Sequence, residues 1–400
     1  AGVANYWKFF DGETKQLIKY KVYDQKQEFE NKFNAWAKGK PEYENIMAEY
    51  AKNYAAWTPY SKMRQYLNEG ILGSPLAGNA SRLISLEDKL IKTNTPAADL
   101  KKAIDAATAA RDAFKESEDL PSDEKILAAT AMMFYNDVDK SQHPIGFYEG
   151  MKAAYGSLND EATFKAWAHD VFAKTMLLDD AKWKAFTAAP TATALQEDPA
   201  FAYAAAFSKN YTSKYLSLRT DFINKNDELG RAYLKGVMEM NPAAVNKMYP
   251  DANFSMRVSY GNVKSYNPRD AVHYDYVCTG KGILEKYVPG DYEFDLPAKQ
   301  IELFKKKDFG QYIDKGRNDL VVSFITTNDI TGGNSGSPVI DANGNLIGLA
   351  FDGNYEALSH KIAFDKDLNR TINVDVRYVL WCIDKLGGAK NIIDELKLVK

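Results

Sequence analysis

Cysteine and histidine are scarce in this sequence. Its 400 residues include two cysteines, Cys278 and Cys382, and four histidines. Two cysteines are too few for a disulfide scaffold or for a zinc site of their own. They could form one disulfide or remain two free thiols, and the sequence leaves both possibilities open. We therefore expect no metal site, and no motif calls for a cofactor.

Long apolar runs and a strong net charge are also missing. No stretch approaches the roughly 18 uninterrupted apolar residues of a membrane span, so none is expected. The formal net charge of −3 gives no electrostatic reason to expect nucleic acid as a partner. The start, AGVANYWKFF, has no initiator Met and no basic segment followed by an apolar run. It resembles neither a cytosolic start nor a signal peptide, so we expect that upstream polypeptide has been removed.

The length and the sequence pattern predict two domains. A chain of 400 residues exceeds what one hydrophobic core usually organises. Between about Lys15 and Asn241, apolar residues recur at helical spacing, and Pro or Gly residues separate long helical segments. Beyond Asn241-Pro242, β-branched and aromatic residues alternate with polar ones. We predict a helical domain over residues 1–249 and a β domain over residues 250–400.

The predicted fold class is α+β multidomain. Asn343-Gly344 predicts a hairpin between two strands, because this pair readily adopts positive φ. Helices are expected over residues 376–386 and 389–399. An antiparallel β unit with a C-terminal helix fits a chymotrypsin-like β-barrel that follows the large α-helical domain. The predicted strands are 254–260, 272–279, 320–327, 337–340, 346–351 and 371–375.

The segment Gly333-Asn334-Ser335-Gly336 carries the clearest chemical signal. A serine hydroxyl becomes a nucleophile on a tight loop that also aims backbone N–H groups at a developing oxyanion. Gly333 and Gly336 permit backbone conformations that a Cβ would forbid, so the N–H groups of Gly333 and Ser335 can converge. The alternative is an ordinary Gly-rich hairpin loop. Strands predicted on both sides favour the catalytic interpretation, with Ser335 as the nucleophile.

This loop resembles the GDSGGP signature of trypsin-like peptidases, with Asn334 in place of Asp and Ser337 in place of the second Gly. In trypsin-like enzymes that Asp pairs with a new N-terminus, so Asn334 implies a site that needs no such pairing. Further segments narrow the resemblance to peptidase family forty-six of the serine class, the bacterial dipeptidyl-peptidases of the 7 and 11 types. The matching segments, in chain order, are NYWK, FSMRVSYG, CTGKGILEKY, GNSGSP, LIGLAFDGNYE and NVDVRYVLW.

The resemblance implies an exopeptidase that releases N-terminal dipeptides from a peptide substrate. In this family an aspartate and asparagines hold the free ammonium group of the peptide, and Asp352 and Asn5 are the matching positions. Asp352 could instead be an ordinary turn residue, and Asn5 a helix cap. The residue after the aspartate lies at the base of the specificity pocket. Gly353 occupies it here, which implies large apolar P1 residues, although it could simply serve a bend.

The histidine base and orienting aspartate of a chymotrypsin-type site are not evident in this sequence. None of its histidines, His143, His169, His273 and His360, has the expected context. We therefore expect a fragment that lacks the N-terminal barrel and is inactive alone. A non-catalytic peptide- or protein-binding module on a degenerate barrel remains the alternative. The resemblance further implies a homodimer at full length, in the periplasm or at the surface of a Gram-negative bacterium.

Overall fold

The computed structural model describes residues 2–117, 119–246, 248 and 255–399, without the side chains of residues 2–6 and 8. Two compact units are present, one formed by residues 33–245 and the other by residues 1–32 together with 246–400. Residues 1–32 therefore group with the β-containing unit, although the sequence predicts them to be part of the helical domain. No helix in the described ranges is long and apolar enough to cross a membrane.

The unit of residues 33–245 is helical, as the apolar spacing predicts. It begins within α2 (Val22–Ala37) and ends with α14 (Pro242–Val245). The elements between them are α3 (Ile46–Gln65), η1 (Tyr66–Ile71), α4 (Pro75–Ser81), α5 (Ile84–Ile91), α6 (Ala97–Ser117), α7 (Leu120–Asp137), η2 (Lys140–Gln142), α8 (Phe147–Tyr155), α9 (Glu161–Lys174), α10 (Asp180–Ala188), α11 (Ala192–Glu197), α12 (Pro199–Lys214) and α13 (Leu216–Met240).

Side-chain caps fix where several of these helices begin. Ser74, Asp160, Asp179, Thr191 and Asp198 each accept a hydrogen bond from a backbone N–H in the first turn of the helix that follows. Such caps satisfy donors that the helix itself leaves unpaired. The turns between helices are thus encoded locally.

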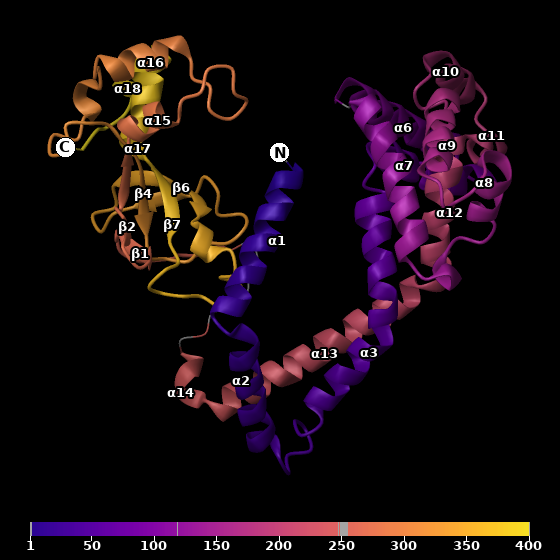
Figure 1. Cartoon of the computed structure of the whole chain (residues 1–400), viewed down its shortest axis with the longest axis horizontal. Coiled ribbons are helices and arrows are strands. Elements are labelled where there is room, and N and C mark those ends of the chain that lie inside the picture. The colour runs from indigo at the N-terminus through magenta and orange to yellow at the C-terminus, as the bar shows by residue number, and fades with distance from the viewer. Residues whose placement is uncertain (1, 118, 247, 249–254, 400) are drawn as a thin grey trace. The chain divides into compact units, whose positions relative to one another are not determined.

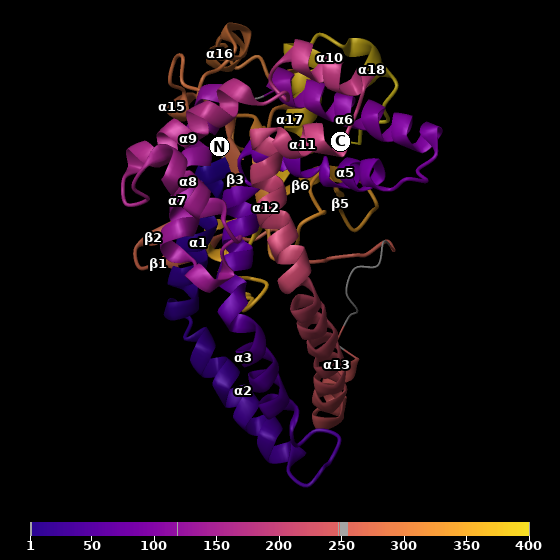
Figure 2. The same cartoon turned by 90° about the vertical axis from the view of Figure 1, so that its right-hand side faces the viewer.

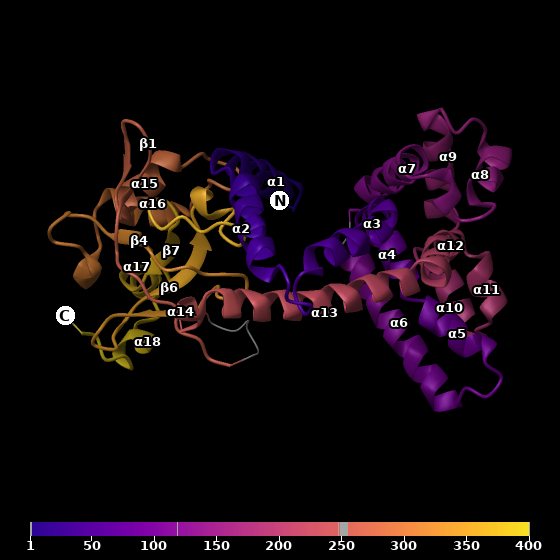
Figure 3. The same ribbon diagram turned by 90° about the horizontal axis from the view of Figure 1, so that it is seen from below.

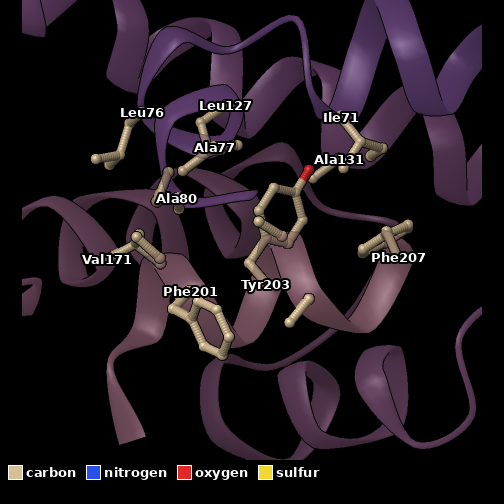
Figure 4. Close-up of a cluster of buried hydrophobic side chains, with 14 of the residues drawn as sticks. Ile71, Leu76, Ala77, Ala80, Leu127, Ala131, Val171, Phe201, Tyr203 and Phe207 are labelled. Carbon is tan, nitrogen blue, oxygen red and sulfur yellow. The ribbon is translucent and has the colours of Figure 1, made fainter. Parts of the chain in front are cut away.

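A large apolar core joins these helices. Helices α7, α8 and α9 lie together (Figure 2), and α13 runs along α3 (Figure 3). Tyr203 of α12 stands in the middle of the core cluster (Figure 4), and burial raises the pKa of its hydroxyl far above the usual range. Phe134 of α7 packs edge-to-face on Phe207, with ring centroids 4.9 Å apart. This unit therefore has a complete core of its own.

The other unit combines helices with two antiparallel sheets. Its helical elements are α1 (Gly2–Lys19), α15 (Gly280–Lys286), α16 (Ala298–Lys305), η3 (Gly310–Tyr312), η4 (Tyr355–Ala357), α17 (Val376–Trp381), η5 (Cys382–Leu386) and α18 (Lys390–Asp394). Its strands are β1 (Tyr266–Arg269), β2 (Val272–Tyr274), β3 (Val277–Thr279), β4 (Val321–Thr326), β5 (Pro338–Ile340), β6 (Leu346–Gly353) and β7 (Thr371–Asp375).

Five of these strands form one sheet in the order β3-β4-β7-β6-β5, and β1 pairs with β2 separately (Figure 1). The hairpin between β5 and β6 is confirmed, with positive φ at Gly344. The predicted strand over 272–279 is interrupted between β2 and β3. The prediction of a strand over 254–260 is wrong for the described residues 255–260, and residue 254 lies outside the described range. α18 is shorter than the predicted helix over 389–399.

Polar contacts stabilise the corner where β7 leads into α17. Asp375 caps α17 and also binds the guanidinium of Arg377, which reaches Asp314 at 3.1 Å. The hydrogen bonds to Asp375 raise the pKa of Arg377. The backbone N–H of Arg317 and the guanidinium of Arg377 both donate to Asp314 and lower the pKa of its carboxyl group.

Cys278 and Cys382 are both free thiols, and burial raises the pKa of Cys382.

Replacing Phe134 by alanine should destabilise the helical unit. Phe134 is 1% exposed, and its removal leaves a cavity among rings that cannot close around it. Losses of about 3–5 kcal/mol are usual for such sites. Chemical denaturation of the chain should show this loss for Phe134→Ala. The neighbouring Met133→Ala is the control, because Met133 is 47% exposed. Similar losses in both variants would contradict the assigned packing.

Candidate active site

The loop that carries Ser335 is fastened to strand β6. The N–H of Gly336 donates to the carbonyl of Ala350 at 2.8 Å, and the N–H of Ala350 donates to the carbonyl of Ser337 at 2.9 Å. The pairing of β5 with β6 thus continues past β5 into the loop. Ser335 therefore leaves the sheet beside the Ala350–Asp352 end of β6.

The interior of the loop is held by Asn334. Its side-chain oxygen accepts from the N–H of Thr331 at 2.9 Å, and its own N–H donates back to the carbonyl of Thr331 at 3.1 Å. The N–H of Ser337 donates to the carbonyl of Asn334 at 3.0 Å. Asn334 is therefore occupied within its own loop.

Some backbone N–H groups in the loop remain available. In the described part of the chain, the N–H groups of Gly333 and Ser335 are among those that donate no hydrogen bond. Gly333 has φ of +98° and Gly336 has φ of +79°, so both occupy the region that favours glycine. The side chain of Ser335 is exposed. The loop thus presents a hydroxyl and unused backbone donors to solvent.

Asp352 and Gly353 are the last two residues of β6, where the strand is irregular. Ala350 is opposite Asn373, but Asp352 is opposite Ile372, so Phe351 is an extra residue in the ladder. Such a bulge redirects the side chains around it. The exposed Asp352 carboxylate accepts only the N–H of Gly353, at 2.7 Å, and forms no ion pair within the described residues. It is free to bind a cation.

The segment after Gly353 is held by a buried amide, which sequence reasoning missed. Asn354 donates from Nδ2 to Glu356 and to the carbonyl of Leu368, both at 2.9 Å. Its Oδ1 accepts from the N–H of Arg370 at 2.9 Å. In the sequence, only its position directly after Gly353, the predicted pocket residue, could have drawn attention to Asn354. Asn354 stabilises the end of the strand that carries Asp352 and Gly353.

The histidines pair with other groups than Ser335. His143 contacts the carbonyl of Val138, and burial lowers its pKa. His169 contacts Glu124, and His273 contacts Asn267. His360 Nδ1 lies 2.7 Å from Asp329 Oδ1 in the segment that leads into the loop. No histidine in the described ranges is hydrogen-bonded to Ser335.

Asn5 is the one predicted site residue whose side chain lies outside the described residues. Its backbone is part of α1. Gly333, Ser335, Asp352 and Gly353 lie on the connected loop and strand described above. The predicted residues of the β domain are thus brought to one end of the sheet, while the structure leaves the side chain of Asn5 undescribed.

Known proteins resemble this chain over nearly its whole length. The family model described as Peptidase S46 matches residues 1–398. The chain is 39% identical to an Asp/Glu-specific dipeptidyl-peptidase of Flavobacterium psychrophilum over 100% of this chain and 54% of that protein. It is 38% identical to dipeptidyl-peptidase 7 of Phocaeicola vulgatus, again over 100% of this chain and 54% of that protein.

A solved structure is also similar. The crystal structure of Porphyromonas endodontalis DPP11 in complex with the dipeptide Arg-Glu matches with a TM-score of 0.81 and 27% sequence identity. The match covers 97% of this chain and 54% of that chain. The chain therefore spans about half the length of the relatives that it matches.

Replacing Gly333 by alanine should disturb the loop, whereas Gly332→Ala should not. A Cβ at either position meets nothing within 4 Å, so crowding does not distinguish them. Only Gly333 has positive φ, where another residue costs about 1–3 kcal/mol. Chemical denaturation should show a lower free energy of unfolding, or a crystal structure a rotated residue 333, for Gly333→Ala alone. Equal behaviour of the two variants would contradict the backbone conformation.

Proposed function

From the premise that this chain belongs to the Peptidase S46 family, we propose that it carries the nucleophile of a serine-type dipeptidyl-peptidase. The observation that supports the proposal is the exposed Ser335 hydroxyl beside two unused backbone donors, on a loop joined to the strand of Asp352. The substrate is a peptide with a free amino terminus. The products are its N-terminal dipeptide and the shortened peptide.

In the proposed reaction, Ser335 Oγ attacks the carbonyl carbon of the second peptide bond. The negative charge on the carbonyl oxygen is stabilised by the N–H groups of Gly333 and Ser335, and such donors stabilise the transition state strongly. The shortened peptide leaves as an amine after it receives a proton. Water then releases the dipeptide from Ser335. This sequence requires a base that takes the serine proton and returns it to the leaving amine.

Asp352 provides the register of the cut. A carboxylate that pairs with the substrate ammonium forms a charge-assisted hydrogen bond. Because Asp352 and Ser335 are both held by β6, a fixed separation between them selects a fixed number of residues between the amine and the reacting carbonyl. In the proposed exopeptidase that number is two.

The proposed reaction still lacks a base and the carboxylate that orients it. Among the residues that the structure describes, no histidine is hydrogen-bonded to Ser335. We propose that polypeptide beyond these 400 residues supplies them, and that the chain is inactive without it. The length of the relatives supports this proposal, because the chain corresponds to 54% of the Flavobacterium protein. The five-stranded sheet would then be part of a second, nucleophile-bearing barrel of the chymotrypsin type.

We propose apolar P1 residues as the preferred substrates. Gly353 adds no side chain and no charge to the pocket, and an uncharged wall favours an apolar group over a carboxylate. The names of the relatives include both an Asp/Glu-specific dipeptidyl-peptidase and a dipeptidyl-peptidase 7. These names do not decide between the two specificities, so the proposal rests on Gly353 at the position that the resemblance assigns to the pocket.

Replacing Ser335 by alanine in the full-length protein should remove dipeptide release. The loss should be roughly a thousandfold or more in kcat, because no nucleophile remains. Circular dichroism and thermal melting should be unchanged, since the side chain of Ser335 is exposed. Ser337→Ala, two residues further along the loop, is the matched control and should keep most activity. Retained turnover by Ser335→Ala would refute the assignment of the nucleophile.

Replacing Gly353 by arginine should move the preference from apolar towards acidic P1 residues. The guanidinium can pair with a carboxylate in the pocket. A Cβ at this position meets the Cβ of Ala357 at 3.3 Å, so only a small adjustment is needed. kcat/KM should be measured for matched dipeptidyl substrates with Leu or Glu at P1.

Gly353→Met provides the control for the size of the new side chain. Methionine fills the pocket without charge, so it should lower kcat/KM for Leu substrates and give no gain for Glu substrates. A gain for Glu in both variants, or in neither, would mean that residue 353 does not line the pocket.

A further inference from the structure

The first helix of the chain is buried along one narrow line. Among residues 9–19 of α1, only Gly12 and Gln16 are buried, and most of the others are exposed. These two positions are four residues apart and therefore lie on the same face of the helix. This face contacts η4, the short helical turn that follows the predicted pocket.

Gln16 uses both ends of its amide in this contact. Its Nε2 donates to the carbonyl of Tyr355 at 2.6 Å. Its Oε1 accepts from the hydroxyl of Ser359 at 2.6 Å and from the N–H of Ser359 at 3.1 Å. Gln16 is 4% exposed and Ser359 is 1% exposed, so water does not replace these hydrogen bonds when they are lost. The contact is specific as well as buried.

Gly12 allows the two segments to approach closely. A Cβ at this position would lie 2.2 Å from Cδ1 of Leu358 and 3.4 Å from the ring of Tyr355. A side chain at position 12 would therefore have to displace the side chain of Leu358. Gly12 and Gln16 together fix both the distance and the register between α1 and residues 355–359.

The docked turn is directly continuous with the proposed amine site. It begins one residue after Asn354, which follows Asp352 and Gly353 in the chain. Asn354 is itself bound to the backbone of Arg370. Residues 352–359 are therefore held at one end by the sheet and at the other end by Gln16.

We propose that Gln16 is a positioning residue for amine recognition. By docking α1 on residues 355–359, it holds the segment that continues from Asp352 and Gly353, and so the position of the carboxylate that binds the ammonium. This inference rests on the proposed function. Because the ammonium is held both before and during the reaction, loss of this contact should weaken substrate binding more than catalysis.

The contact itself can be tested without any enzymatic assay. In the 400-residue chain, hydrogen–deuterium exchange of residues 355–361 and of α1 should become faster in Gln16→Ala. The control is Gln25→Ala, because Gln25 is exposed and its side chain bonds only to the carbonyl of Tyr20. Exchange that is unchanged in Gln16→Ala would overturn the docking role.

The kinetic consequence is tested in the full-length protein. Gln16→Ala should raise KM for free-amine dipeptidyl substrates about tenfold and change kcat less than about threefold. Gln16→Glu keeps the acceptor for Ser359 but loses the donor to Tyr355, so its KM should be intermediate. A merely destabilised protein would instead lose kcat at constant KM, through a smaller folded fraction.

A second pair of variants tests the close approach. Gly12→Leu should separate α1 from the turn and raise KM, and the double variant with Leu358→Ala should restore it by making room. If Ser335→Ala is inactive and wild type releases dipeptides, but the variants at 12 and 16 keep the wild-type KM, the positioning role is refuted while the proposed function stands. If wild type releases no dipeptides, the proposed function itself fails.

Discussion

The pairing of the Ser335 loop with strand β6 is the constraint on which the rest of the site depends. Two hydrogen bonds, from Gly336 to Ala350 and from Ala350 to Ser337, extend the β5–β6 ladder into the loop. They place the serine and the Asp352 carboxylate on one continuous piece of sheet. A loop held only by its own turns would leave their separation undefined, and the proposed exopeptidase reaction needs that separation to be fixed.

That arrangement requires positive φ at Gly333 and Gly336. The loop must turn sharply between the end of the sheet and β5, and glycine does so without strain. The same turns leave the N–H groups of Gly333 and Ser335 without an internal acceptor. Exposed unpaired donors cost little because water binds them. In the proposed reaction, the tight turns would therefore also supply the oxyanion site.

The sequence predicts those parts that are encoded by local patterns. β4, β6 and β7 lie close to their predicted ranges, and Gly344 marks the hairpin as expected. The segment 255–260 alternates like a strand but forms none in the described part, because strand formation requires a partner strand and not only a pattern. α15 and α16 were not predicted. Their short lengths of 7 and 8 residues give weak periodicity.

The long-range polar contacts could not be predicted. Gln16 and Ser359 are separated by 343 positions, and nothing in their neighbours indicates that they pair. The same contact helps to explain why residues 1–32 group with the β-containing unit: its hydrogen bonds connect α1 to the turn of residues 355–359, which follows β6. Helical periodicity alone is equally compatible with either unit. A buried polar pair specifies which surfaces meet, because a displaced register leaves its groups unsatisfied.

Arg370 is a second buried polar side chain that connects distant segments, here at the end of the sheet. Its side chain is buried, and it donates to the carbonyls of Lys264, Ser265, Lys366 and Asn369. Burial lowers the pKa of the guanidinium, yet it remains charged at any physiological pH. Four carbonyls from two distant segments therefore converge on one cation. Directional hydrogen bonds from Arg370, Asn354 and Gln16 thus hold the neighbouring backbone in place. Apolar packing tolerates small displacements of the backbone, whereas directional hydrogen bonds do not. The proposed site, which would select substrates by a fixed distance, needs support of the second kind.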